Sequence, residues 1–218
     1  MKKSGRIIAL LLCIAMALTA AGCSKSKKKK NQEPVDDSKL TNFTLNDDGS
    51  FTVLYEEEFN ESYYDKKELE TLIDSEISEF NSALAADKNK GMSKESFKIE
   101  GGNAKLVLKF NSVADYMSYE SNYVNSNRNA VLFIGKYKDA VAAGYTMAGK
   151  FLAANGKDTF DKNTLVADDN TYVLYTNQSY NIEVPGEILA ISHRSTINTK
   201  TSQVRTPDLR ENYIIFKK

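Results

Sequence analysis

The sequence predicts an α+β fold, a single domain in which a largely antiparallel β-sheet is packed by two or three helices. Short segments rich in Thr, Val, Ile, Phe and Tyr follow one another through tight-turn signals, which is the pattern of antiparallel hairpins. Segments with apolar residues three or four positions apart lie between them, without the regular alternation of strand and helix that a parallel sheet requires. The chain has 218 residues, is 41% hydrophobic and contains three prolines, so it has enough apolar material for a globular core.

Two hairpins have the clearest signals. Residues 40–46 and 50–59 flank an Asp-Asp-Gly turn, in which Asp-Gly supplies the positive φ angles of a tight connection. Residues 96–100 and 104–110 alternate between apolar and polar side chains around a Gly-Gly turn. We therefore expect both pairs of segments to form antiparallel strands.

A helix over residues 65–86 is predicted after the first hairpin. Asp65 is its expected N-cap and Glu68 stands three positions later, which is the pattern of a capping box. Its apolar residues recur at helical spacing, and we expect this stripe to lie across the sheet as the centre of the core. The stripe consists of Leu69, Leu72, Ile73, Ile77, Phe80 and Leu84.

Further along the chain, short elements are predicted. Ser112 precedes Asp115 by three positions and is expected to cap a short helix, with a buried stripe of Val113, Tyr116, Met117, Tyr123 and Val124. Pro185 with Gly186 marks a sheet edge or a bulge, because proline cannot donate to a strand ladder. The other expected elements are strands at 130–134, 149–154, 172–176, 181–192, 196–204 and 213–217, with short helices at 139–143 and 161–167.

The first 22 residues have the organisation of a secretory signal peptide. Lys2, Lys3 and Arg6 precede an unbroken apolar segment over residues 7–18, and small residues follow it. The apolar segment is shorter than the roughly 20 residues that a membrane-spanning helix needs. An uncleaved transmembrane anchor is therefore the less favoured alternative.

Ala20, Ala21, Gly22 and Cys23 end this segment. In this pattern the chain resembles bacterial lipoproteins, whose lipobox is an aliphatic residue, two small residues and a cysteine; Ala20 stands where that aliphatic residue is usually Leu. The resemblance implies that residues 1–22 are removed and that Cys23 carries diacylglycerol, with palmitate among the acyl groups. It implies a protein held by its lipid anchor on the extracytoplasmic face of the cell membrane.

The lipoprotein assignment determines which cysteines remain in the mature chain. Cys13 leaves with the signal peptide and Cys23 becomes a thioether, so the mature chain has neither a free thiol nor a disulfide. This excludes a cysteine nucleophile, a CxxC redox centre and thiolate zinc sites. The extracytoplasmic domain must then be stabilised by its core alone.

Residues 23–39 are predicted to be the lipidated cysteine and a lysine-rich tether, and residues 40–218 to be the domain. Lys25 and Lys27–Lys30 either contact anionic head groups or wall polymers, or belong to a soluble spacer. Eight of the 29 bases and none of the 29 acids lie in the first 30 residues, so the chain from Asn31 on has a net charge of −8. An acidic body disfavours nucleic acid as a partner.

Three short motifs of the body carry a second resemblance: Asn46-Asp-Asp-Gly-Ser50, Leu132-Phe133-x-Gly135 followed by Ala140-x-x-Ala-Gly-Tyr145, and Val184-Pro-Gly-x-Ile188. In these the chain resembles a Firmicutes-type family of cell-surface lipoproteins of uncharacterised function and, more distantly, LppM-type lipoprotein domains. The resemblance implies a lipid-anchored extracytoplasmic module with a lipid or an envelope polymer as its ligand. It assigns no functional residue to this chain.

Two motifs have only part of what their chemistry requires. Residues 144–150 match the GxxxxGK of a phosphate-binding loop, but Phe151 stands where a hydroxyl must hold Mg²⁺, so we expect no nucleotide. His193 is the only histidine and no GxSxG motif accompanies it. It is expected to be a surface or strand-end residue, and a site with several histidine ligands is excluded.

The acidic clusters and the tyrosines are less specific. The clusters lack the spacing of a calcium loop and are expected to form a solvated rim; they are Glu56, Glu57, Glu58, Glu61 and Asp65, and Asp168 with Asp169. Tyrosine is favoured in recognition patches, but packing within the fold explains most of the tyrosines in this chain. The candidates are Tyr63, Tyr64, Tyr116, Tyr119, Tyr123, Tyr172, Tyr175 and Tyr180.

From these observations we expect a non-catalytic binding or structural module of the cell envelope, with Cys23 as its lipidation site. We expect no cofactor, metal or catalytic residue; the partners are the membrane and a lipid or envelope polymer. The alternative is a carboxylate-dependent hydrolase that acts on envelope glycans. A pocket with two facing carboxylates would favour the hydrolase, and an apolar or tyrosine-lined groove would favour the binder.

Overall fold

The computed structural model describes residues 41–61, 63–84, 91–124, 130–165, 168–207 and 210–218. The predicted signal peptide, Cys23 and the lysine-rich tether lie outside these residues, as do Val166 and Ala167 at the end of the helix expected at 161–167. Among the described residues, no helix is both long enough and apolar enough to cross a membrane.

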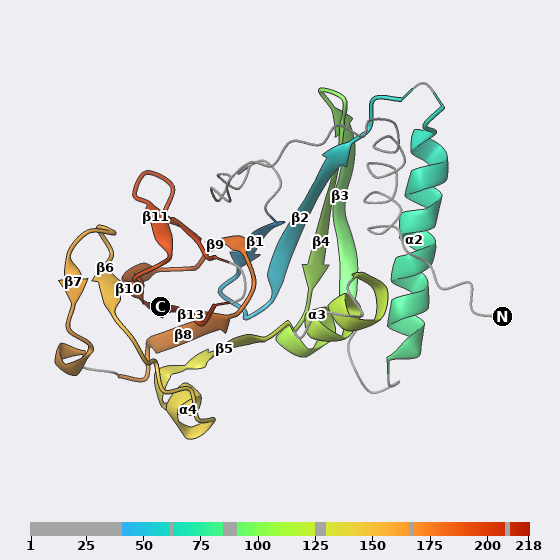
Figure 1. The fold of residues 1–218 in the computed structure, drawn as a ribbon. Coiled ribbons are helices and arrows are strands. Elements are labelled where there is room, and N and C mark those ends of the chain that lie inside the picture. Colours follow the sequence, from blue (N-terminus) through green and yellow to red (C-terminus); the bar gives the residue numbers. More distant parts are fainter. Residues whose placement is uncertain (1–40, 62, 85–90, 125–129, 166–167, 208–209) are drawn as a thin grey trace, which may run out of the picture.

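The fold is α+β, as predicted, but its strands form two sheets (Figure 1). Sheet A has the order β11 (Thr196–Asn198), β12 (Gln203–Arg205), β9 (Tyr180–Glu183), β1 (Thr41–Leu45), β2 (Phe51–Glu58), β4 (Asn103–Phe110) and β3 (Met92–Glu100). Sheet B has the order β5 (Leu132–Lys136), β8 (Thr171–Thr176), β13 (Asn212–Lys217), β10 (Glu187–Ser192), β6 (Phe151–Ala153) and β7 (Thr159–Phe160). Neighbouring strands are antiparallel except β1 and β9.

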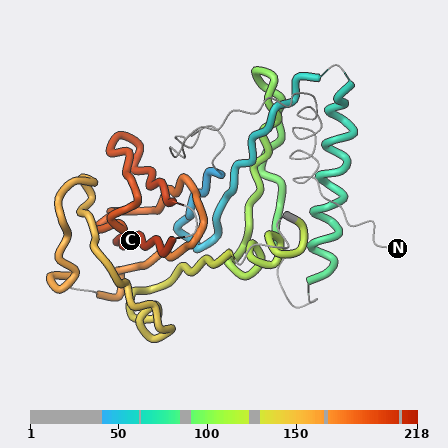
Figure 2. The backbone as a smooth tube through the Cα atoms, viewed as in Figure 1, coloured from blue at the N-terminus to red at the C-terminus, as the bar shows by residue number. Residues whose placement is uncertain are grey.

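The helices lie at the two ends of this arrangement. α2 (Lys66–Ala83) runs along β3, the edge strand of sheet A, and α4 (Tyr137–Ala142) lies against β5 and β8 of sheet B (Figures 1 and 2). Between them, α3 (Val113–Tyr119) continues into the π-helical turn η2 (Glu120–Val124). A 3₁₀ turn, η3 (Lys162–Thr164), replaces the longer helix expected there.

The two expected hairpins are confirmed. β1 pairs with β2 in the register Leu45↔Phe51, and Gly49 has a φ of +83° in the turn between them. β3 pairs with β4, but it begins at Met92 and contains a bulge between Lys94 and Ser96 that the sequence did not predict. The segment expected as one strand over 196–204 is a third hairpin of β11 and β12.

Pro185 and Gly186 mark the point at which the chain leaves sheet A for sheet B. The interruption expected within one strand therefore separates β9 from β10, which belong to different sheets. Gly186 has a φ of +81°, and a β-carbon there would overlap the carbonyl oxygen of Lys217. Only glycine accommodates both this conformation and this close approach. Because the chain passes from sheet A to sheet B at this point, the structure has two sheets where the sequence predicted one.

The start of α2 follows the prediction, whereas its position in the core does not. The Asp65 carboxylate accepts hydrogen bonds from the backbone N–H groups of Lys67 (2.7 Å) and Glu68 (3.0 Å). Ile73 and Phe80 are buried, but Leu72 is 41% exposed and Ile77 is half-buried. The helix covers the edge of sheet A, because its contacts with the sheet concentrate on β3. The expectation that its stripe forms the centre of the core is wrong.

Aromatic rings from sheet A and α3 occupy the centre instead. Phe51 stacks on Phe43 with ring centroids 4.5 Å apart and meets Tyr116 edge-on at 5.3 Å. Phe110 packs on both Phe51 (5.7 Å) and Tyr116 (5.2 Å). Such pairs add about 0.5–1.5 kcal/mol each beyond the area they bury. This cluster joins the two hairpins to α3.

Strand β13 of sheet B is buried on both faces. Ile214 and Phe216 of β13 belong to the core shared with sheet A, whereas Tyr213 and Ile215 belong to a second apolar cluster on the opposite face. Asn212 at the start of the strand is also buried, and its amide nitrogen donates to the carbonyl oxygens of Thr176, Pro207 and Arg210. A strand covered on both faces reads as a continuous apolar run, which is how residues 213–216 read.

Ion pairs tie the ends of the elements together. Lys94 of β3 contacts both Glu70 (3.0 Å) and Asp74 (2.7 Å) of α2. Lys217 contacts Asp168 at 2.9 Å, and Lys138 contacts Asp169 at 2.7 Å. The hydrogen bonds from Lys217 and Thr171 lower the pKa of Asp168 to about 2.

Replacing Ile73 by Ala should lower the free energy of unfolding by roughly 2–5 kcal/mol, because it removes buried methyl groups and leaves a cavity. Ser78→Ala, on the exposed face of the same helix, should change it by less than about 0.5 kcal/mol. Urea midpoints of the two variants measure the contrast. Equal midpoints would show that this face of α2 is not part of the core. Asp74→Ala is a poorer control, because Asp74 is bound to Lys94.

The pairing of Asp168 predicts a pH dependence. Its pKa is about 2 in the folded protein, below the ordinary value of 3.8, so its contribution to stability is present above pH 4 and is lost as the pH falls from about 4 to 2. The difference in urea midpoint between the wild type and Asp168→Asn should therefore shrink over this pH window. A difference that stays constant down to pH 2 would contradict the pairing.

Candidate functional site

The structure separates the tyrosines into an interior group, an outer group and an exposed tip. Tyr116, Tyr119 and Tyr180 lie in the core, while Tyr175 lies on the outer face of sheet B. Tyr63 is 71% exposed beyond the end of β2 and contacts Tyr64 edge-on at 4.8 Å. The helical stripe after Ser112 predicted the burial of Tyr116. The sequence could not sort the other tyrosines, because their burial depends on which elements pack over them.

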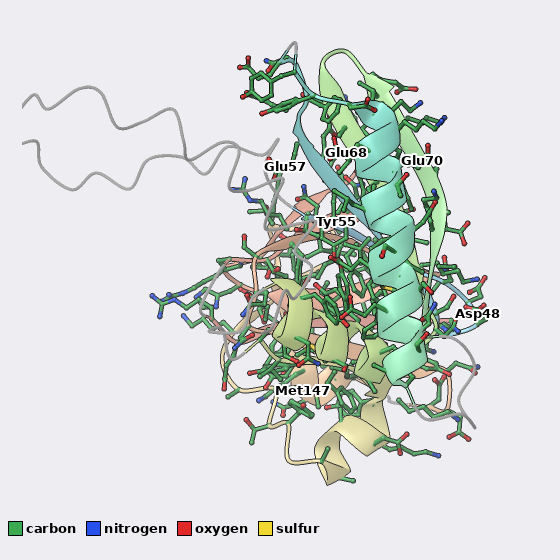
Figure 3. The ribbon with its side chains drawn as sticks, turned by 90° about the vertical axis from the view of Figure 1, so that its right-hand side faces the viewer. Asp48, Tyr55, Glu57, Glu68, Glu70 and Met147 are labelled. Carbon is green, nitrogen blue, oxygen red and sulfur yellow. The ribbon has the colours of Figure 1, made fainter. Side chains whose placement is uncertain are left out.

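The interior group forms a polar network with two glutamates. The Tyr119 hydroxyl donates to Glu76 at 2.6 Å, and the hydroxyls of Tyr116 and Tyr180 are 2.8 Å apart. Burial raises the pKa of Tyr116 and of Tyr119 well above the usual range. Figure 3 shows Tyr55 in this interior region, where its hydroxyl donates to Glu120 at 3.4 Å.

Glu76 is a residue that the sequence analysis missed. It is 4% exposed, although glutamate is rarely buried without partners. Its position three residues after Ile73 and four before Phe80 places it on the buried stripe, and that spacing is the signal that could have identified it. Because Tyr119 satisfies its carboxylate, we assign this network to holding α2 and α3 on sheet A.

The outer group forms an aromatic wall of Phe133, Tyr145, Tyr175 and Tyr213. Phe133, Tyr175 and Tyr213 stand directly opposite one another on β5, β8 and β13, since the registers are Phe133↔Tyr175 and Tyr213↔Tyr175. Tyr145 comes from the loop after α4, and its ring lies 4.7 Å from Phe133 and 4.8 Å from Tyr175. Tyr175 and Tyr213 are 4.9 Å apart. Except for Tyr213, which is buried, these side chains are half-buried.

Backbone features hold the wall in place. The Phe133 ring lies over Gly135, where a β-carbon would come within 2.8 Å of it. The Tyr145 amide donates to the Ala140 carbonyl at 3.0 Å. Met147 has a φ of +47°, unusual for a residue with a side chain, and its carbonyl accepts a hydrogen bond from Lys162 at 3.1 Å. Figure 3 places Met147 close to α4, far from Glu57 and Glu68.

The wall borders one carboxylate. Glu211 immediately precedes β13 and is exposed. Burial, and after it the charge of Glu211, raises the pKa of Tyr213 to about 12. The pKa of Tyr175 is also raised, by burial first and then by Glu211. Both phenols are therefore neutral near pH 7. The wall offers ring faces, hydroxyl groups and one negative charge, which are means of binding rather than a nucleophile.

The phosphate-loop pattern has no structural counterpart. Residues 144–150 form the loop between α4 and β6, so they precede a strand, whereas a phosphate-binding loop opens a helix. Phe151, at the hydroxyl position of the pattern, is buried as the first residue of β6. Gly144 and Gly149, the two glycines of the pattern, have φ values of +88° and +94° and lie in the turns of the loop.

The remaining sequence candidates do not meet in one place. His193 is exposed in the turn between β10 and β11, as expected for a surface or strand-end residue. Glu56 contacts Lys105 (3.4 Å), and Asp65 caps α2. Within the described residues, no group of three or more His, Cys, Asp or Glu side chains could hold a metal ion.

Comparisons with protein-family models, with curated proteins and with solved structures found no match for this chain. The candidate site therefore rests on the geometry of the chain itself. The aromatic wall combines partly exposed rings, a fixed backbone and an adjacent charge, and it is the arrangement in the described residues that best fits a binding site.

Proposed function

We propose that the protein is a lipid-anchored lipoprotein on the extracytoplasmic face of the cell membrane, with a non-catalytic binding or structural module as its body. The observation that carries this proposal is the sequence Ala21-Gly22-Cys23 at the end of a secretory signal. The described body, which begins with β1 at Thr41, is the part that the anchor presents outside the membrane.

The chemistry of the body supports binding over catalysis. The aromatic wall provides ring faces and hydroxyl groups, which are the usual contact groups of recognition surfaces. The ligand is a component of the envelope, a lipid or a polymer, since these are the partners within reach of a membrane-anchored domain. The net charge of −8 from Asn31 on argues against nucleic acid, and the loop over residues 144–150 lacks the context for a nucleotide.

The hydrolase alternative has one pair of carboxylates in its favour. Glu76 and Glu120 both raise the pKa of Tyr119, after its burial, so they lie near one phenol. Glycoside hydrolysis needs two carboxylates about 5–10 Å apart on either side of a bound sugar. The Tyr119 hydroxyl already holds Glu76, which is buried. This arrangement favours a structural role for the pair.

Cys23→Ala should abolish retention in the membrane and leave the body folded, because the anchor and the core are separate units. Fractionation of cells and labelling with a fatty-acid analogue measure retention and acylation. A variant that stays in the membrane without an acyl group would establish an uncleaved helix as the anchor. The thermal midpoint of the variant should match that of the wild type, which controls for misfolding.

The hydrolase alternative has its own test. We expect the wild type and the variants Glu76→Gln and Glu120→Gln to release no new reducing ends from purified envelope glycans. Activity of the wild type that both substitutions abolish, with folding retained in circular dichroism, would replace the proposed function by the hydrolase.

A further inference from the structure

We propose that the aromatic wall and Glu211 form a binding site for a small organic cation, a quaternary or protonated amine. This inference rests on the binding-module part of the proposed function and is independent of the lipid anchor. It specifies the chemical group, a positively charged amine, by which an envelope component would bind to a site that sequence patterns did not identify as a unit.

The rings of the wall provide the first attraction. Phe133, Tyr175 and Tyr213 form one row across three strands, and Tyr145 packs over the first two at 4.7 and 4.8 Å. Phe133, Tyr145 and Tyr175 are half-buried and their ring pairs are tilted by 40–46°, so part of their ring surface is accessible, whereas Tyr213 is buried and forms the base of the wall. The faces of aromatic rings are electron-rich and attract cations within about 6 Å of the ring centroid.

The carboxylate of Glu211 provides the second attraction. Glu211 is exposed at the start of β13, two residues before Tyr213, and it makes no hydrogen bond or ion pair with the residues that the structure describes. Its charge also contributes to the raised pKa of Tyr175 and of Tyr213. Lys162, which contacts the loop behind the wall, is bound to the carbonyl oxygen of Met147. A ring surface beside an unpaired carboxylate favours a positive ligand over a neutral or negative one.

The site is also organised before a ligand arrives. Gly135 leaves room for the Phe133 ring, and the loop that carries Tyr145 is fixed by the hydrogen bonds of Ala140 and Met147. Tyr213 is buried in a strand covered on both faces. A preformed site spends little of its binding energy on ordering side chains. A neutral sugar could stack on the same rings, but it would not use the charge of Glu211.

Choline and 3,3-dimethyl-1-butanol test this distinction, because they share a shape and differ in the positive charge. The full-length protein in a non-ionic detergent would be titrated with each compound, with the ring signals of ¹³C-labelled tyrosine followed by NMR. We expect choline to bind about tenfold or more tightly than the neutral alcohol. The shifted signals should be those of Tyr145 and Tyr175, the half-buried tyrosines of the wall.

Matched variants separate the two attractions. Glu211→Gln should weaken choline binding several-fold and leave the weak binding of the alcohol unchanged. Tyr175→Leu keeps an apolar side chain but removes the ring, and it should also weaken choline selectively. Glu100→Gln and Tyr63→Leu, at the opposite end of the molecule, should have no effect. Thermal midpoints equal to that of the wild type confirm that each variant is folded.

Three results would overturn the inference. Equal binding of choline and the alcohol would show an apolar patch without charge selectivity. Shifts confined to tyrosines outside the wall would place the cation elsewhere. Binding of maltotriose to the wall, with no binding of choline, would make the ligand a carbohydrate. This last result would still agree with the proposed binding module. Membrane retention and acylation of the Cys23→Ala variant test the lipid anchor separately.

Discussion

The burial of β13 on both faces is the constraint on which the rest of the structure depends. Ile214 and Phe216 belong to the core shared with sheet A, and Tyr213 and Ile215 belong to the second apolar cluster, against which the other rings of the aromatic wall pack. The chain has no cysteine after Cys23, so no disulfide within the body can substitute for this packing. A domain of this kind depends on apolar burial for its stability. Strand β13 contributes buried side chains to the apolar clusters on both of its faces.

The same constraint links the fold to its candidate site. The switch at Pro185 and Gly186 sends the chain into sheet B, where β10 pairs with β13. β13 in turn pairs with β8 and sets Tyr213 opposite Tyr175. Three of the four wall residues thus stand on strands that also contribute to the core, with Tyr213 buried and Phe133 and Tyr175 half-buried, so their positions are fixed by the strand pairing. Sites on rigid strands hold their side chains more precisely than sites on loops.

Local signals predicted the elements well, and long-range packing decided the rest. Asp65 and Ser112 are the caps that their side chains indicated, and the Asp-Asp-Gly and Gly-Gly turns join the expected hairpins. The sheet switch could not be predicted, because a Pro-Gly pair is compatible with a bulge, an edge or a change of sheet. The wall could not be predicted either, because residues 133, 175 and 213 meet only through strand order. Leu72 follows helical spacing yet is exposed, since α2 covers only the edge of a sheet.

Native mass spectrometry of the protein extracted from its own membrane tests the central claim, a lipid-anchored module that binds a small cation, most directly. The account predicts a chain that begins at Cys23 and carries acyl groups, with a bound amine whose occupancy falls in Glu211→Gln. A chain that retains residues 1–22 without acyl groups would contradict the anchor. A bound anion or neutral polymer, unaffected by Glu211→Gln, would contradict the assignment of the site.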